Sequence, residues 1–229
     1  MKVLLTNGSP HAKGCTYTAL CEVAEALNKE GIETQIFQVG TKPISGCLGC
    51  GACMKTGRCV ISDTVNEFLD LAEQADGFVF GSPVHFASAS GMLTSFMDRA
   101  FYGRGNLFAY KPAACILSCR LGRSFFVAIF FAYNPAPAIM SCRRGGATAA
   151  FEQINKYFTI SNMPIVGSQY WNMVHGNTPD EVKQDLEGLQ TMRTLGLNMA
   201  WLLKSIQAGK EAGLQLPQRE PAVKTNFIR

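Results

Sequence analysis

The chain has 229 residues, of which 47% are hydrophobic and 17% charged, and its formal net charge is +4. This composition excludes an intrinsically disordered protein, which combines low hydrophobicity with high net charge, and the 22 Gly and 10 Pro follow no collagen-like period. The 21 basic residues form no stripe of the kind that binds nucleic acid, so we expect no nucleic-acid partner.

The first part of the chain predicts strand, helix, strand and an irregular loop. Residues 2–6 are a short apolar run that stops at a Gly-Ser-Pro turn, which indicates a buried strand. A helix follows, because the next apolar residues recur with the spacing of one helical face: Leu20, Val23, Ala24 and Leu27. Residues 34–39 predict a second strand. Residues 43–62 are rich in Gly and Cys, which is typical of an irregular loop.

The middle of the chain continues this alternation. Apolar spacing predicts a helix over residues 65–72, and the run at 77–81 predicts a buried strand. A helix over residues 90–102 comes next. Further along, the same patterns predict a helix over 149–158 and a short strand at 165–167.

The last helix has a clear start signal. Thr178 and Glu181 are spaced as a capping box, and Pro179 stands at the first helical position. We expect one long helix from there to Ile206. The polar residues 215–229, with two prolines, predict a loose tail.

Strands that alternate with helices pair in parallel through right-handed crossovers. We therefore expect an α/β fold, a doubly wound five-stranded parallel sheet with helices on both faces. Residues 1–214 form this single domain, and residues 215–229 are its tail. Ligands of such sheets bind outside the carboxyl ends of the strands, where the strand order switches. The residues just after each strand are therefore the candidates for a site.

A tandem duplication spans residues 108–143. Residues 108–120 recur at 131–143, with nine of thirteen positions identical. One repetition is too few for a solenoid, which needs about three or more units. We interpret it as a duplicated strand with its approach loop, so that two copies compete for one position in the sheet. Because the second copy continues into the next helix, we expect it to fill that position and the first copy to form an added strand or excursion.

The loop after the first strand has the make-up of an anion site. It opens the first helix, whose N-terminal N–H groups attract anions, and it offers hydroxyl groups and basic side chains. It has neither the G-x-G-x-x-G fingerprint nor the Gly-Lys-Ser/Thr of a P-loop. A phosphate cradle of flavodoxin type remains, with turn geometry alone as the alternative. The candidate residues are Ser9, His11, Lys13, Gly14, Cys15 and Thr16.

Two further loops follow strands that we expect at the switch point. After the strand at 77–81, a proline-fixed turn and an aromatic residue would let backbone groups approach a flat ring; core packing and surface exposure are the alternatives. Its candidates are Pro83, Val84, His85 and Phe86. After the duplicated strand, paired arginines would meet an anionic substrate or cofactor, or form a solvated loop. The candidates there are Ser141, Arg143, Arg144 and Gly145.

Four of the nine cysteines lie within thirteen residues, at Cys47, Cys50, Cys53 and Cys59. Four thiolates at such short spacing suit a [4Fe–4S] cluster. Structural zinc more often uses two close pairs that lie far apart in the sequence. The residues alone leave open a cluster, zinc, free thiols or a thiol pair that exchanges disulfides.

Together with Ser95-Phe96-Met97-Asp98-Arg99 and Gly167-Ser168-Gln169-Tyr170-Trp171-Asn172, these loops resemble the NADPH-dependent FMN reductase family. The cysteine block is most similar to its iron–sulfur flavoprotein branch, in which such a motif holds a [4Fe–4S] cluster. The resemblance covers about residues 1–206 and implies a flavodoxin-like fold with bound FMN. It places the FMN phosphate on the loop after the first strand. The flavin ring would lie between the second loop and residues 141–145.

The expected function is that of an FMN-dependent NAD(P)H oxidoreductase. It would take hydride from NAD(P)H onto the bound flavin and pass the electrons on to an acceptor. That acceptor would be a flavin, a quinone, an iron–sulfur cluster or a protein partner. The alternatives are a non-enzymatic flavodoxin-type carrier and a quinone, nitro- or azo-compound reductase. No catalytic side chain is assigned, because the cofactor carries the chemistry.

The expected location is cytoplasmic. No targeting segment precedes the first strand. The most apolar stretch, residues 124–133, is too short to span a bilayer, so we expect no membrane partner. The charged share is below the usual value of about 25%, which with the family resemblance favours a homodimer or homotetramer.

Overall fold

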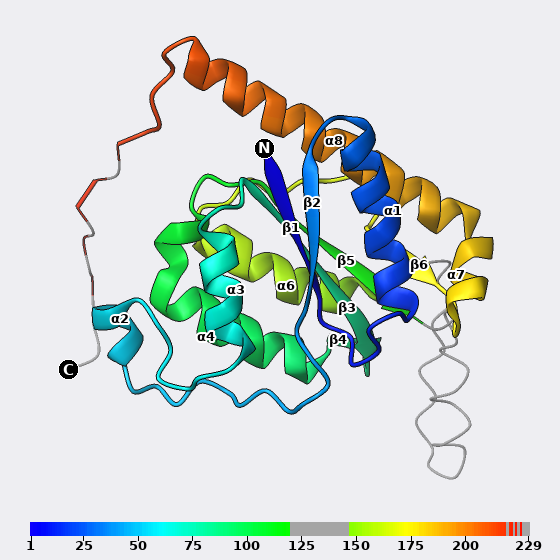
Figure 1. Cartoon of the computed structure of the whole chain (residues 1–229), viewed down its shortest axis with the longest axis horizontal. Helices are drawn as coiled ribbons and strands as arrows, with labels where there is room; N and C mark the ends of the chain where they lie inside the picture. The colour runs from blue at the N-terminus through cyan, green and yellow to red at the C-terminus, as the bar shows by residue number, and fades with distance from the viewer. Residues whose placement is uncertain (120–146, 219, 222, 224, 226–229) are drawn as a thin grey trace.

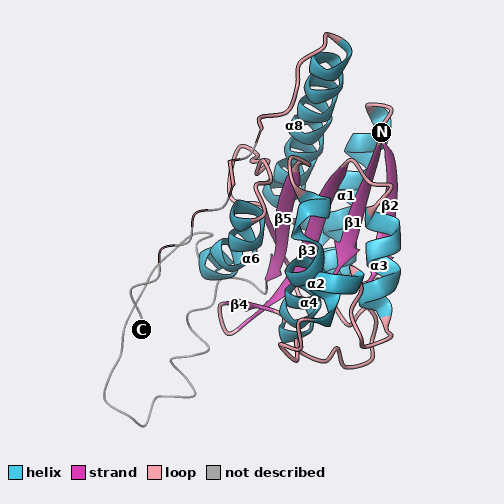
Figure 2. Cartoon of the chain, turned by 90° about the vertical axis from the view of Figure 1, so that its left-hand side faces the viewer, coloured by secondary structure: helices cyan, strands magenta, loops and turns pink. Residues whose placement is uncertain are grey.

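The computed structural model describes residues 1–119, 147–218, 220, 221, 223 and 225. They form a sheet with the strand order β2-β1-β3-β5-β6, in which all these neighbours pair in parallel (Figure 1). The strands are β1 (Lys2–Asn7), β2 (Glu33–Gln38), β3 (Gly77–His85), β5 (Ala113–Cys119) and β6 (Met173–His175). The two residues of β4 (Ser88–Ala89) return antiparallel to the end of β3 and form a hairpin with it (Figure 2).

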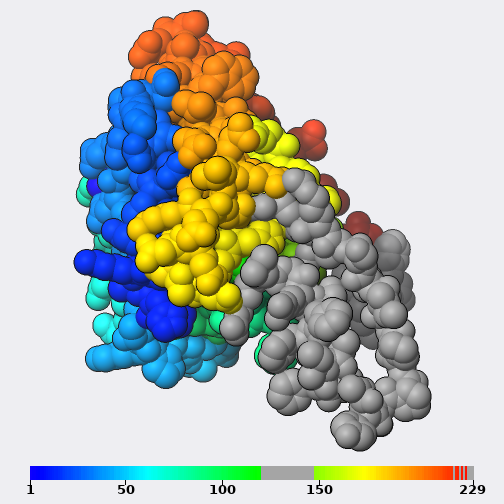
Figure 3. Space-filling view, turned by 90° about the vertical axis from the view of Figure 1, so that its right-hand side faces the viewer, coloured from blue at the N-terminus to red at the C-terminus, as the bar shows by residue number. Residues whose placement is uncertain are grey.

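Helices cover both faces of the sheet, as expected. One face carries α1 (Cys15–Lys29), α7 (Pro179–Gln184) and α8 (Leu186–Glu211), and the other carries α3 (Thr64–Ala72), α4 (Gly91–Phe108) and α6 (Thr148–Ile160). Figure 3 shows α1, α7 and α8 as one continuous surface. The short helix α2 (Ala52–Thr56) lies within the cysteine-rich segment. None of the described helices is long and apolar enough to cross a lipid bilayer.

The buried strands divide their side chains between two cores. In β3, Phe78 and Phe80 join the core under α3, α4 and α6, whereas Val79 joins the core under α1 and α8. This follows from the period of two along a strand, which sends successive side chains to opposite faces. Because both faces are covered, these strands appear in the sequence as continuous apolar runs.

Two of the expected elements are wrong in detail. Residues 165–167 form only an isolated bridge, at Ile165, and the last strand of the sheet is β6. The expected long helix is interrupted at Asp185, whose φ of −78° and ψ of 72° are not helical. The Asp185 carboxylate accepts hydrogen bonds from the N–H of Gly188 at 3.1 Å and of His175 at 2.7 Å. It therefore caps α8 and ties it to the sheet.

The first copy of the duplication, not the second, fills the sheet. Strand β5 lies between β3 and β6 and consists of residues from the first copy, while the second copy lies outside the described residues. The Ala113 N–H donates to the Pro164 carbonyl oxygen, and the Ala113 carbonyl oxygen accepts from the Val166 N–H, on the β6 side. Because successive residues of a strand point their backbone groups to opposite neighbours, the N–H and C=O of Ala114 face β3. The second copy has Pro137 at this position. Proline has no N–H to donate to a central strand.

Helix α8 crosses α1 at a point that requires glycine. A Cβ on Gly196 would lie 2.6 Å from the Ala26 Cβ and 3.0 Å from the Val23 carbonyl oxygen. We expect Gly196→Ala to lower the free energy of unfolding, because overpacking costs about 1–3 kcal/mol and alanine regains only about 1 kcal/mol of helix propensity. Urea unfolding measures the difference. In the control Gly209→Ala, the new Cβ would meet only Leu214, at 3.4 Å; equal stability of the two variants would contradict the packing argument.

Candidate functional site

The loop after β1 and the end of β3 lie side by side at the carboxyl edge of the sheet. The Gly8 N–H donates to the Gly81 carbonyl oxygen at 2.8 Å, and the Ser90 hydroxyl donates to the Gly8 carbonyl oxygen at 3.1 Å. A Cβ on Gly8 would lie 2.8 Å from that Gly81 oxygen, so glycine is needed for the approach. The structure thus brings the first and second predicted loops together at the switch point of the sheet.

Asn7, at the end of β1, organises the first loop and is not among the residues that the sequence predicts for the site. Its side chain accepts from the Ser9 N–H at 3.1 Å, and it donates to the His11 carbonyl oxygen at 3.3 Å and to the Gln38 side chain at 2.7 Å. Gln38 in turn donates to the Ser9 carbonyl oxygen at 2.7 Å. A buried asparagine directly before a Gly-Ser-Pro turn is the signal that could have identified it.

Helix α1 begins at this loop without a side-chain cap. Gly14 is its N-cap residue, and no side chain accepts from the first amides. Such amides leave partial positive charge at a helix start, which favours an anion. Ser9 is buried and its Oγ accepts from the His11 N–H at 3.1 Å. The side chains of His11 and Lys13 are exposed around the loop.

Two predicted phosphate residues have partners in the protein itself. The Thr16 hydroxyl lies 2.7 Å from the Ser118 hydroxyl of β5, and this hydrogen bond is buried. The Cys15 thiol donates to the Gly176 carbonyl oxygen at 3.7 Å, next to β6. Both side chains therefore fix the start of α1 against the sheet.

The second loop differs from the expectation in its local structure. Pro83, Val84 and His85 are the last residues of β3 rather than a loop, and β4 pairs with them as a hairpin. Phe86 and Ala87 form its tip with positive φ values of 49° and 61°. The Phe86 side chain is fully exposed there. Ser-Pro usually marks a turn, which is why the sequence predicts a strand end at residue 81; proline is tolerated here at the sheet end.

The third predicted loop lies outside the described residues, and this includes Ser141, Arg143, Arg144 and Gly145. Its counterpart in the first copy begins at Ser118, the residue that contacts Thr16. The end of β5 therefore reaches the same edge as the other two loops.

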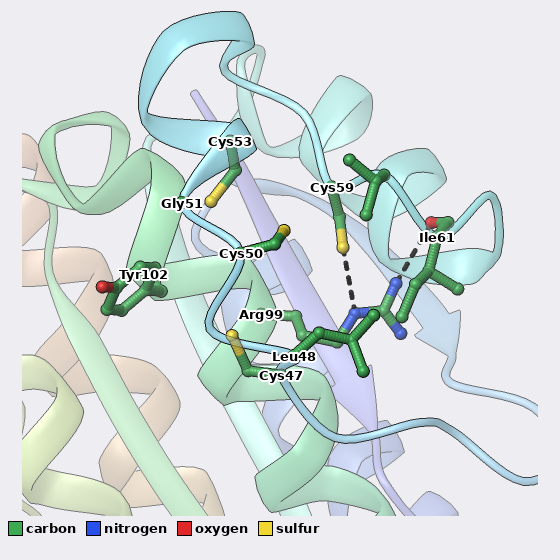
Figure 4. A pocket seen from close by; sticks show the side chains of 10 residues that line it. Cys47, Leu48, Cys50, Gly51, Cys53, Cys59, Ile61, Arg99 and Tyr102 are labelled. Carbon is green, nitrogen blue, oxygen red and sulfur yellow. Dashed lines mark hydrogen bonds between the residues drawn. The ribbon is translucent and has the colours of Figure 1, made fainter.

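The four clustered cysteines line one pocket (Figure 4). Cys53 lies on α2, and the other three lie in the irregular segments on either side of it. Positive φ values at Gly49, Gly51 and Gly57 allow the chain to curl around the pocket. A Cβ on Gly103 of α4 would lie 2.6 Å from the Cys53 Cβ, so glycine is also needed under the pocket. The described residues contain no group of three or more His, Cys, Asp or Glu side chains close enough to bind a single metal ion.

Two residues outside the predicted set fix Cys59. The Arg99 Nε donates to the Cys59 Sγ at 3.2 Å, from the buried side of the pocket. Asn66 accepts from the Cys59 N–H at 3.0 Å and donates to its carbonyl oxygen at 2.9 Å. Burial lowers the pKa of Arg99, but its hydrogen bonds to Asp63 and Cys59 outweigh burial and raise that pKa. The sequence signal for Arg99 is its place in an otherwise apolar helical stripe, where an unpaired charge would be costly.

The scattered cysteines have a different character. Burial raises the pKa of the Cys115 thiol well above its usual range, and it also raises the pKa values of Cys15 and Cys21. Thiols with raised pKa values react slowly, because the thiolate is the nucleophile. Cys47 and Cys50, in contrast, are exposed.

The strand order and the loops at its carboxyl edge define a flavodoxin-like protein, and solved structures share this fold. The NAD(P)H:quinone oxidoreductase from Methanothermobacter marburgensis is similar with a TM-score of 0.60 at 15% identity, over 87% of this chain and 98% of that chain. A flavodoxin from the domain Archaea is similar with a TM-score of 0.54 at 13% identity, over 89% of this chain and 99% of that one.

Sequence comparison gives the family. The profile of the NADPH-dependent FMN reductase family matches residues 1–178, and the chain belongs to this family. An iron-sulfur flavoprotein of Methanocaldococcus jannaschii is 32% identical over 212 residues, which are 90% of this chain and 100% of that relative. The protein is therefore a flavin-dependent oxidoreductase, and the expected family and fold are confirmed.

Proposed function

We propose that the protein accepts hydride from NAD(P)H on bound FMN and passes electrons onward through a [4Fe–4S] cluster held by Cys47, Cys50, Cys53 and Cys59. The observation that carries this proposal is the convergence of these four cysteines on one pocket, in a chain that also has an uncapped helix start after β1. FMN would supply two-electron chemistry and the cluster one-electron chemistry.

The residues present fit both groups. At the carboxyl edge, Ser9 and the first amides of α1 would hold the FMN phosphate, with His11 and Lys13 adding positive charge. Pro83 to Phe86, at the end of β3 and the tip of its hairpin, would border the flavin ring. The cysteine pocket supports a cluster, because four thiols at this short spacing line one pocket.

The loop geometry predicts an effect of Asn7 on flavin binding. Asn7→Ala removes the side-chain hydrogen bonds to Ser9, His11 and Ala12 that hold the loop and the one to Gln38, so the free loop must be ordered when FMN binds. We expect the Kd for FMN to rise about 10-fold to 100-fold, which corresponds to about 1.4–2.7 kcal/mol. Quenching of flavin fluorescence measures it. Asn7→Ser keeps a neutral acceptor for the Ser9 N–H and should lose less; an unchanged Kd in both variants would show that Asn7 does not order the FMN site.

The proposed function is tested on protein purified without oxygen. We expect a flavin spectrum, about four irons and four sulfides per chain, and loss of the flavin absorbance on addition of NADPH or NADH. The control in which all four clustered cysteines are changed to serine should keep the flavin and lose the iron.

Each part of the proposal can fail separately. Flavin without iron in the natural chain would leave the cysteines as thiols and the protein as a plain FMN reductase. A flavin that neither nicotinamide reduces would rule out the hydride step and leave an electron carrier. Activity with quinone, nitro- and azo-compounds separates the remaining acceptors.

We also propose that the chain forms a homodimer or homotetramer. Leu197 and Trp201 lie one turn apart on α8, and their side chains are 48% and 70% exposed. A low charged share and an exposed apolar face favour self-association. Sedimentation should give a mass of two or four chains, and Trp201→Lys should reduce it; a monomer at micromolar concentration would contradict the proposal.

A further inference from the structure

Arg99 lies under the cysteine pocket with every donor occupied. Its side chain is 1% exposed. The Nε donates to the Cys59 Sγ at 3.2 Å, and the two terminal nitrogens donate to the Asp63 carboxylate at 2.6 and 2.8 Å. The same nitrogens also reach the carbonyl oxygens of Ser45 at 3.4 Å and Ile61 at 3.1 Å. All five N–H groups of the guanidinium are thus used.

This arrangement fixes the direction of the Nε–H bond. The Asp63 carboxylate binds the guanidinium in a fork, which sets the plane of the group. With that plane fixed, the Nε–H points at the Cys59 sulfur (Figure 4). Asn66 holds the Cys59 backbone through both its N–H and its C=O, so the starting point of the Cys59 side chain is fixed. Among the described residues, no other clustered cysteine has such a charged donor on its sulfur.

A hydrogen bond to a cluster sulfur changes the reduction potential. If the pocket holds a cluster, one electron from the reduced flavin would add one negative charge to the cluster and its four thiolates, and no bond to a proton would be needed. An N–H···S bond from a cation becomes stronger as that charge grows, so it stabilises the reduced state. Removal of this hydrogen bond should therefore make reduction of the cluster harder.

We propose that Arg99 is the positioning residue that orients Cys59 and raises the reduction potential of the group that the four cysteines hold. This inference rests on the proposed function, because it requires that the pocket hold a cluster. It goes further in assigning one of the four ligands, Cys59, as the sulfur through which the protein sets the potential.

The test is a redox titration of the holoprotein, followed by electron paramagnetic resonance. We expect Arg99→Lys to lower the midpoint potential, because lysine keeps the charge but cannot donate to Cys59 and Asp63 in one plane. A tenfold weaker preference for the reduced state corresponds to about 59 mV for one electron. Arg99→Gln, which also removes the charge, should lower it further.

The matched control is Arg104→Gln. Arg104 lies on the same helix and donates to the Gly57 carbonyl oxygen at 3.3 Å and to Glu73 at 2.7 Å, so it also supports the cysteine segment. It donates to no cysteine sulfur in the part of the chain that the structure describes, and its removal should leave the potential unchanged. An equal shift of the midpoint potential in the Arg99 and Arg104 variants would show that loss of any nearby positive charge causes it. That result would overturn the proposal.

The outcomes separate this inference from the proposed function. A natural chain without iron overturns both. A natural chain with a cluster, whose potential is the same in the Arg99 variants, overturns only the role of Arg99. Where a single variant fails to fold or to load iron, Arg99→Met combined with Asp63→Asn leaves no unpaired buried charge and gives the same comparison. A potential equal to that of the natural chain would then overturn the inference.

Discussion

A variant that lacks residues 121–143 is expected to fold like the full chain, whereas a variant that lacks residues 108–130 is expected to be less stable by about 3 kcal/mol. Both deletions remove one repeat and leave chains of equal length. The first keeps the copy that forms β5. The second places Pro137 where Ala114 now stands, in the middle of a central strand. The lost ladder bond and the unsatisfied buried acceptor account for this cost.

Urea unfolding of the two deletion variants measures the difference. Pro137→Ala in the less stable variant should restore most of the stability, because the other replacements in the strand, Cys115 by Ala and Leu117 by Met, are small core changes. Both variants retain the sequence Ser-Cys-Arg-Arg-Gly after the strand, so both folded chains should bind FMN. Equal stability of the two variants would show that either copy can fill the sheet.

The duplication also shows what the sequence can and cannot predict. Apolar runs and helical spacing predict both layers of helices and the parallel strands β1, β2 and β3, because burial on both faces imposes those patterns. The competition between two near-identical segments depends on a single donor, and the sequence does contain the deciding residue, Pro137. The connection of the second copy to the next helix, on which the sequence-based prediction relies, is the weaker argument.

The site is predictable only where local chemistry defines it. The short spacing of the four cysteines predicts that they lie near one another, and all four line one pocket; their role as ligands stays a prediction. Arg99 cannot be placed in this way, because it reaches Cys59 from α4, 40 residues further along the chain. Asn66 is only seven residues from Cys59, but its contacts depend on how the loop folds back onto α3. For Thr16, the predicted phosphate role stays a prediction. Its hydroxyl suits a phosphate by position, but tertiary packing gives it Ser118 as a partner.

The buried ion pair between Arg99 and Asp63 predicts the second large effect. Asp63→Ala is expected to lower the free energy of unfolding of the iron-free chain by about 3–5 kcal/mol, because it leaves the Arg99 charge buried without its partner. The Asp63 carboxylate also accepts from the Val65 N–H at 3.1 Å and caps α3, and such a cap contributes about 1 kcal/mol. Urea unfolding at pH 7 measures the sum.

The surface pair of Arg58 and Asp70 provides the matched control. Those side chains are 51% and 55% exposed, so Asp70→Ala should change the free energy of unfolding very little. Asp63→Asn keeps an oxygen for the Val65 N–H but loses the charge. Its loss in free energy of unfolding should lie between those of Asp63→Ala and Asp70→Ala. If Asp63→Ala cost no more than Asp70→Ala, water would have to reach Arg99. The fork could not then hold the Nε–H on Cys59, so this stability measurement also tests the geometry on which the role of Arg99 depends.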